Sequence, residues 1–114
     1  MLLGLLILFL IVAAGGVTLA FLEARRHAPP LPVGAIHGTA ALVAIVLLVL
    51  QDVAHPGNHL ANAATVVFML TAAGGLLLFA FRATRQRLPL PVVALHAGFA
   101  LSALVLLGAG WLRS

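Results

Sequence analysis

Residues 13–37 read AAGGVTLAFLEARRHAPPLPVGAIH, and residues 72–96 read AAGGLLLFAFRATRQRLPLPVVALH. The two segments align without a gap at an offset of 59 residues, and 20 of 47 positions are identical over 9–55 against 68–114. Each copy contains a diglycine, an arginine-bearing joint, a Pro-Leu-Pro-Val motif and a histidine. The sequence therefore indicates a tandem duplication of one structural unit.

The composition is typical of a membrane protein. Of the 114 residues, 64% are hydrophobic and 7% are charged, and the mean hydropathy is +1.26. A helix needs about 20 apolar residues to cross a bilayer. Segments of this kind cover residues 2–22, 32–52, 60–81 and 91–112. Because the joints between them are shorter than about ten residues, consecutive helices must run antiparallel.

We therefore expect an all-α integral membrane protein with a single transmembrane domain over residues 1–114. It is a four-helix bundle of two tandem helical hairpins, repeat A at about 1–55 and repeat B at about 60–114. Because a two-helix unit returns the chain to its starting side, the two repeats are parallel and share one orientation in the membrane.

Arginines are concentrated in the first and third joints. All six Lys or Arg residues are arginines, and five lie in these joints: Arg25, Arg26, Arg82, Arg85 and Arg87. By the positive-inside rule both joints face the cytoplasm, and both termini lie outside (N-out, C-out). We expect the bacterial inner (cytoplasmic) membrane as the location. The high sequence pI follows from this topology and from contact with anionic lipid headgroups, so no nucleic acid partner is expected.

His37 and His96 occupy the same place in the two copies. Each comes five residues after the second proline of its motif, about 8–9 Å inside the cytoplasmic boundary. Each also shares a stripe with Gly or Ala residues, which is typical of a face that meets another helix or a ligand. We expect both side chains to point inward. An ionisable side chain inside a membrane segment is a functional-site candidate.

The diglycines lie at the same level, about 9–10 Å from the cytoplasmic ends of their helices. They are Gly15, Gly16, Gly74 and Gly75. Two inward imidazoles are thus expected beside two diglycines, which have no side chains to fill the space. This arrangement fits a b-type haem, whose iron takes axial ligands from both sides of a flat ring. We expect one haem b, with His37 and His96 as the iron ligands and the glycines beside the porphyrin edge.

Neighbouring residues complete the predicted haem site. Gly38 and Ala97, next to the ligands, leave the faces of the porphyrin clear. Arg26 and Arg85, together with another arginine of the same joints, are expected to pair with the haem propionates.

A bare metal ion fits the same residues less well. Zinc takes three or four protein ligands, whereas this level offers two histidines and Glu23 is expected at the membrane edge, on a different level. The absence of cysteine excludes thiolate sites, iron–sulfur clusters and covalently attached haem.

Each imidazole also needs a hydrogen-bond partner for its second nitrogen. We assign this role to the backbone carbonyl of Val33 for His37 and of Val92 for His96, one turn earlier in the same helix.

Other interpretations remain open. The histidines could hydrogen-bond across helices while the diglycines serve close packing, in a cofactor-free accessory or structural subunit of a larger membrane complex. A proton relay or transporter is disfavoured because both acidic residues, Glu23 and Asp52, are expected at the interfaces. His55 and His59 flank an external turn and are interpreted as exposed loop residues, unless a partner subunit completes a site there.

The paired histidines with small neighbours, His37-Gly38 and His96-Ala97, give the chain a layout that resembles the haem-binding cores of membrane b-type cytochromes. Examples are the cytochrome b561 group and the cytochrome b of quinol-oxidising complexes. Those families usually carry a second histidine pair further along the same helices. Here Gln51 and Asp52, and Gly110 and Trp111, stand there instead, so a second haem is not expected.

The resemblance implies electron transfer by the chain as a protein or as a subunit, rather than catalysis on its own. The expected partners are the lipid bilayer, other membrane subunits or further copies of the chain in a homo-oligomer, and a quinone.

Overall fold

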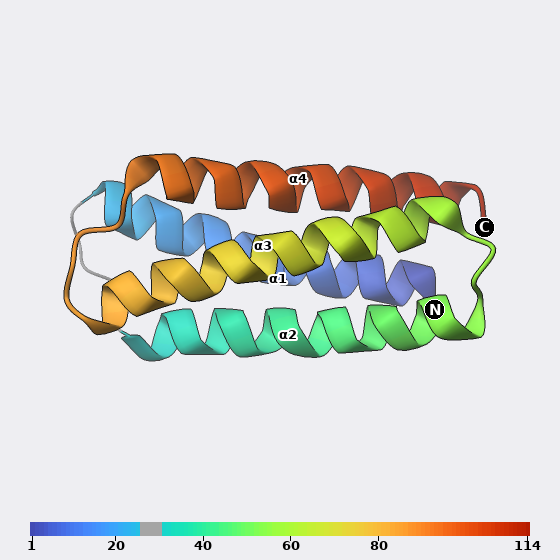
Figure 1. Ribbon diagram of the computed structural model, residues 1–114, viewed down its shortest axis with the longest axis horizontal. Helices are drawn as coiled ribbons and strands as arrows, with labels where there is room; N and C mark the ends of the chain where they lie inside the picture. Colours follow the sequence, from blue (N-terminus) through green and yellow to red (C-terminus); the bar gives the residue numbers. More distant parts are fainter. Residues whose placement is uncertain (26–30) are drawn as a thin grey trace.

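The computed structural model describes residues 1–25 and 31–114, and over these residues it contains helices and no strand (Figure 1). The helices are α1 (Leu2–Ala24), α2 (Leu31–Ala54), α3 (His59–Ala83) and α4 (Leu90–Leu112). All four are long and apolar enough to cross a membrane. The prediction of four apolar helices is confirmed, and each predicted end lies within two residues of the observed one. The architecture is thus compatible with an integral membrane protein.

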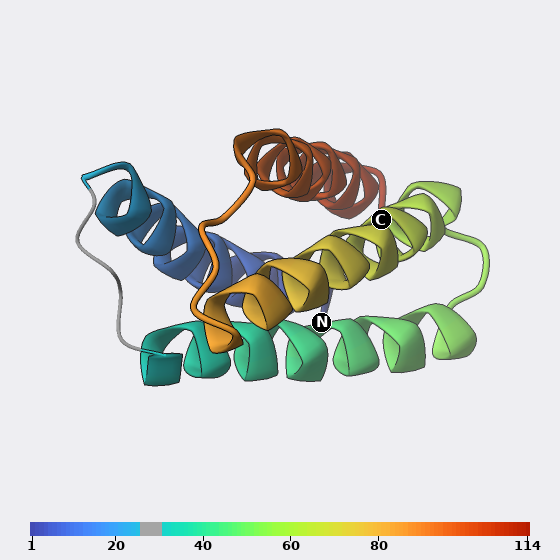
Figure 2. The same cartoon turned by 60° about the vertical axis from the view of Figure 1, so that its left-hand side comes forward.

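The helices form an elongated bundle of 43 × 22 × 19 Å (Figures 1 and 2). Consecutive helices run in opposite directions, and both termini lie at the same end of the bundle. Among the described residues, each helix packs against two neighbours, in the cyclic order α1, α2, α3, α4 and back to α1. Consequently α1 lies diagonally opposite α3, and α2 lies diagonally opposite α4.

The packed core lies in the half of the bundle that holds the termini. Most of its residues fall into pairs 59 positions apart: Leu2 and Ala61, Leu5 and Ala64, Phe9 and Phe68, Ala44 and Ala103, and Leu48 and Leu107. The rings of Phe9 and Phe68 stack across the bundle, with centroids 3.8 Å apart and planes inclined by 10°. The same positions of both copies therefore build this core.

Asn58 joins α3 to α4 at the end of the bundle that holds the termini. Its Oδ1 accepts a hydrogen bond from Ala61 N (3.1 Å) and caps α3. Its Nδ2 donates to the carbonyl of Gly110 in α4 (2.9 Å). A Cβ at position 110 would lie 3.1 Å from both Ala61 N and Asn58 Oδ1, so this close approach requires glycine.

We predict that Asn58→Ala lowers the free energy of unfolding by about 1–2 kcal/mol, because the cap and the link to α4 are both lost. Asn58→Asp keeps the acceptor for Ala61 and loses the donor to Gly110, so its effect should be smaller. Thermal unfolding in detergent micelles measures both, with the exposed neighbour His59→Ala as the control. Equal unfolding temperatures for Asn58→Ala and His59→Ala would contradict this role.

Candidate functional site

A cavity of about 410 Å³ occupies the half of the bundle opposite the packed core. This volume lies within the range of about 300–1,000 Å³ that is common for small-molecule sites. The wall is mainly apolar, and its charged or imidazole side chains are Glu23, His37, Arg82 and His96. Residues from all four helices contribute, and we refer to this space as the histidine cavity.

Much of the cavity wall again consists of residues 59 positions apart. The pairs are Gly16 and Gly75, Leu19 and Leu78, Ala20 and Phe79, Glu23 and Arg82, Gly34 and Val93, and His37 and His96. In several pairs the chemistry of the two members differs. Glu23 and Arg82 carry opposite charges, and the small Ala20 corresponds to the large Phe79. The duplicated positions surround one cavity, but its two halves are not equivalent.

His96 enters the cavity from α4 with one nitrogen already held. Its Nδ1 lies 2.8 Å from the carbonyl oxygen of Thr71 in α3. Because a carbonyl oxygen can only accept, Nδ1 must donate, so the neutral ring keeps the lone pair of Nε2 free for a metal or a proton. The assignment of this role to the carbonyl of Val92 was wrong, because α3 comes close enough to supply its own carbonyl.

His37 enters from α2, diagonally opposite His96. Its Nδ1 is buried and has no hydrogen bond among the described residues, so the prediction that Val33 would accept one was also wrong. The carbonyl of Val12, at the position equivalent to Thr71, interacts with His37 but does not reach hydrogen-bond geometry. The two imidazoles thus occupy equivalent positions, but only that of His96 has a hydrogen bond at Nδ1.

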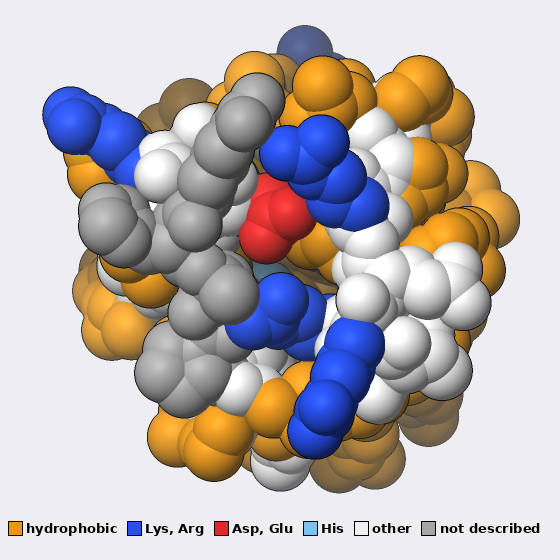
Figure 3. Space-filling model, turned by 90° about the vertical axis from the view of Figure 1, so that its left-hand side faces the viewer, with side chains coloured by type: hydrophobic (Ala, Val, Ile, Leu, Met, Phe, Trp, Pro, Cys, Tyr) orange, Lys and Arg blue, Asp and Glu red, His pale blue; other side chains and the backbone are white. Residues whose placement is uncertain are grey.

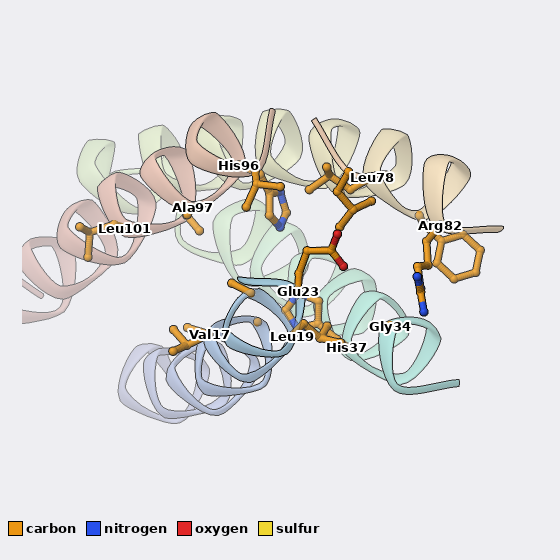
Figure 4. Close-up of a pocket in the computed structure, with 18 of the residues that line it drawn as sticks. Val17, Leu19, Glu23, Gly34, His37, Leu78, Arg82, His96, Ala97 and Leu101 are labelled. Atoms are coloured by element: carbon orange, nitrogen blue, oxygen red, sulfur yellow. The ribbon is translucent and has the colours of Figure 1, made fainter. Parts of the chain in front are cut away.

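Both imidazoles lie in the wall of the same cavity, on opposite sides of it (Figure 4). Figure 4 shows the carboxyl group of Glu23 reaching into the space beside His96, and Arg82 at the far side of the cavity. Both imidazole groups therefore line the same cavity.

Each imidazole rests on the diglycine of its own hairpin. A Cβ at Gly16 would lie 3.0 Å from Cε1 of His37, and a Cβ at Gly75 would lie 3.0 Å from Cε1 of His96. Cβ atoms at Gly15 and Gly74 would lie 3.6 Å and 3.7 Å from the Nδ1 atoms of the same rings. The glycines thus make room for the imidazoles. Clearance for a porphyrin edge remains a prediction for these four residues.

The other expected site residues are distributed unevenly. Ala97 lines the cavity, whereas Gly38 does not, and nothing lies within 4 Å of a Cβ built at Gly38. Arg82 lines the cavity, whereas Arg85 does not. Arg26 lies outside the described residues.

Arg85 has an unusual backbone conformation for its residue type. Its φ is +57°, in the left-handed region, at the end of α3. Gln86 N donates to Phe81 O (2.9 Å) and Arg85 N donates to Arg82 O (3.1 Å), which is a Schellman motif whose left-handed position usually holds glycine. A side chain there costs about 1 kcal/mol, so a basic group is retained at this end of the bundle in spite of backbone strain.

Glu23 is a cavity residue that the sequence analysis did not assign to the site. It was expected at the membrane edge, on a different level from the histidines. It lies in the last turn of α1, and it also lines the cavity that both histidines line. Viewed from this end of the bundle, an acidic side chain lies in a hollow between arginines, and a histidine is visible beneath it (Figure 3). The repeat offers the missed signal, since Glu23 stands where the second copy has Arg82.

Within residues 1–25 and 31–114, no group of three or more His, Cys, Asp or Glu side chains could hold a metal ion. The two imidazoles would therefore need a metal that brings further ligands with it. A comparison of the chain with protein-family models, curated proteins and solved structures gives no match.

We predict that Gly16→Ala and Gly75→Ala each destabilise the bundle by about 1–3 kcal/mol, because the added methyl group displaces a half-buried imidazole ring. Gly98→Ala on α4 is the control, since a Cβ there meets nothing within 4 Å. Alanine's better helix propensity should make the control neutral or stabilising by about 0.5–1 kcal/mol. Chemical unfolding in detergent compares the three, and equal stabilities would refute the close contact.

Proposed function

We propose that this protein is a membrane b-type cytochrome-like electron-transfer protein or subunit that binds one bis-histidine haem near the cytoplasmic face. The observation that carries the proposal is the pair of imidazoles from diagonal helices in one apolar cavity. The hydrogen bond from His96 Nδ1 to Thr71 O leaves Nε2 with a free lone pair, which is the state that an axial ligand requires.

The donor set favours haem over a bare metal ion. A porphyrin supplies four nitrogens to its iron, so two imidazoles complete the coordination. The two rings differ in one respect, because His96 Nδ1 donates to Thr71 O while the buried Nδ1 of His37 has no hydrogen bond among the described residues. Arg82 in the cavity wall is suited to pair with a propionate, and we assign the same role to Arg85 and Arg26.

The residues of the chain have simple tasks in this proposal. A bound haem supplies reversible one-electron exchange between ferric and ferrous iron. His37 and His96 hold the iron, and Gly15, Gly16, Gly74 and Gly75 keep the helices close without blocking the rings. If both histidines held the iron, the protein would leave no coordination position open for oxygen. The electrons would pass to or from a quinone or a neighbouring redox subunit.

The exposed surface supports the proposed placement in a membrane. Large apolar side chains are exposed on the outside of the helices, for example Ile11 (64%), Val46 (58%) and Leu70 (54%), as expected of a surface that meets lipid. We propose that the arginine-rich end faces the cytoplasm of a bacterium (N-out, C-out), with the two hairpins related by a pseudo-two-fold axis along the membrane normal.

One observation favours a second candidate, a cofactor-free accessory subunit of a larger membrane complex. Each imidazole packs on the diglycine of the preceding helix, and His96 also bonds to the backbone of α3. Contacts of this kind would close each hairpin without any cofactor. In that case the duplicated residues serve only the assembly of the bundle.

We predict that the purified protein shows the absorption bands of a low-spin bis-histidine haem, and that His37→Ala and His96→Ala each abolish them by removing an axial ligand. His59→Ala, at an exposed position, should leave the spectrum unchanged. Helix content by circular dichroism identifies variants that fail to fold. A colourless, folded wild-type protein expressed with haem available would refute haem binding and support the accessory subunit.

Orientation can be tested with single cysteines, because the native chain has none. His55→Cys lies at the end of the bundle with the termini, and Gln86→Cys lies at the arginine-rich end; both positions are exposed. On intact cells an impermeant maleimide should label His55→Cys and leave Gln86→Cys unlabelled until the membrane is permeabilised. The reverse pattern would contradict the proposed orientation.

A further inference from the structure

A second cavity, of about 570 Å³, lies at the end of the bundle that holds the termini. The turn between α2 and α3 is at this end (Figure 1), and we refer to the space as the turn cavity. Its wall contains Leu2, Gln51, Asp52, residues 55–58, Leu60, Ala61, Arg113 and Ser114. The turn cavity shares none of these residues with the histidine cavity, so it is a separate site.

The carboxylate in the wall of the turn cavity is not a copy made by the duplication. Asp52 corresponds to Trp111 in the second repeat. Thr65, which contacts the carboxylate from α3, corresponds to Leu6 in the first repeat. Because apolar side chains take both places in the other copy, packing of the duplicated helices does not account for a carboxylate here.

The carboxylate of Asp52 is oriented by α3 and has one oxygen without a partner. Thr65, which is 6% exposed, donates a hydrogen bond from its hydroxyl group to Oδ2 of Asp52. Oδ1 is buried and accepts no hydrogen bond from any described residue, including Arg113 in the same wall. A buried charged group with an unpartnered oxygen is costly. The carboxylate therefore retains the capacity to accept hydrogen bonds from a cationic donor.

A hydrogen bond between Gln51 and His55 defines two further groups of the wall. Nε2 of Gln51 can only donate, so Nδ1 of His55, 3.1 Å away, accepts. The neutral imidazole then carries its proton on Nε2, which is a donor, and Oε1 of Gln51 remains an acceptor. Asp52 and Gln51 thus supply acceptors to the wall. His55 and Arg113 supply donors.

This polar wall lies at the level of lipid headgroups when the bundle spans a membrane. Asp52 comes two residues before the end of α2, and Arg113 directly follows α4. At a rise of about 1.5 Å per residue, each is within about 3 Å of a helix end. Trp111, which is 37% exposed, belongs to a residue type that is enriched at membrane–water interfaces. A lipid headgroup is therefore the chemical group that this cavity meets in a membrane.

We propose that the turn cavity binds the headgroup of a zwitterionic phospholipid with a primary ammonium group, as in phosphatidylethanolamine. The ammonium group donates to the carboxylate of Asp52, and the phosphate accepts from Arg113 and from Nε2 of His55. An anionic lipid without an amine would leave the carboxylate unpaired, and a quaternary ammonium group has no N–H to donate. The proposal does not depend on haem, because the histidine cavity lies in the other half of the bundle.

Native mass spectrometry of the delipidated protein in detergent tests this site with dioctanoyl lipids. Dioctanoyl phosphatidylethanolamine should bind at least about tenfold more tightly than dioctanoyl phosphatidylcholine, which corresponds to roughly 1.4 kcal/mol. The two lipids have the same net charge and the same phosphate, but only the primary ammonium group donates hydrogen bonds. Equal dissociation constants for the two lipids would overturn the proposal.

Two variants separate the groups of the wall. Asp52→Asn removes the charge and keeps an oxygen to which Thr65 can donate, and its affinity for phosphatidylethanolamine should fall to that for phosphatidylcholine. Arg113→Gln, at an exposed position, should weaken both lipids by a similar factor, because they share the phosphate. If circular dichroism shows that Asp52→Asn does not fold, the wild-type comparison and Arg113→Gln decide the question.

The matched control is Glu23→Gln, which removes the other acidic side chain of the chain, at the opposite end of the bundle. It should retain the preference for phosphatidylethanolamine. A preference that persists in Asp52→Asn, or that Glu23→Gln abolishes to the same degree, would overturn the assignment to Asp52.

Free O-phosphoethanolamine carries the same ammonium and phosphate groups without acyl chains. It should bind at least about tenfold more weakly than the lipid, because it lacks the apolar chains that extend along the helices. Equal binding of the two would overturn the lipid assignment and indicate a water-soluble zwitterion as the ligand of the turn cavity.

Discussion

The fit of two imidazole rings onto two diglycines is the constraint on which the half of the bundle with the histidine cavity depends. At Gly16 and Gly75 even one additional carbon would come within 3.0 Å of a histidine ring. Because the rings lie where side chains would otherwise stand, adjacent helices approach each other and His96 reaches a backbone carbonyl of α3. Because each ring packs on a diglycine, the imidazoles lie in the cavity wall and do not fill the cavity.

The duplication divides the bundle into two halves with different roles. Towards the termini, equivalent residues such as Phe9 and Phe68 meet across the bundle and fill it. Towards the other end, small side chains do not fill the space between the helices, and the histidine cavity remains there. The packed core uses equivalent residues, whereas the cavity wall departs from this equivalence. Glu23 stands opposite Arg82 in the alignment, so the charges of the wall are unequal, and Leu104 lines the cavity while its counterpart Ile45 is packed in the core.

Sequence reasoning located the helices because the apolar length of a segment is a local property of the sequence. It failed for the partners of the imidazole nitrogens, because the choice between a carbonyl in the same helix, at Val92, and one in the neighbouring helix, at Thr71, depends on the distance between helices. It did not assign Glu23 to the cavity wall, because a long side chain at the end of a helix can reach away from the level of its own backbone.

The sequence by itself determined four apolar helices, their antiparallel order and the equal depth of His37 and His96, since these follow from segment length, joint length and a fixed rise per residue. Only the tertiary structure decided that both rings line one cavity and that their nitrogens have unequal partners. The physical reason is that a periodic pattern gives a residue its face and depth. The space left between helices depends instead on how every neighbouring side chain packs at once.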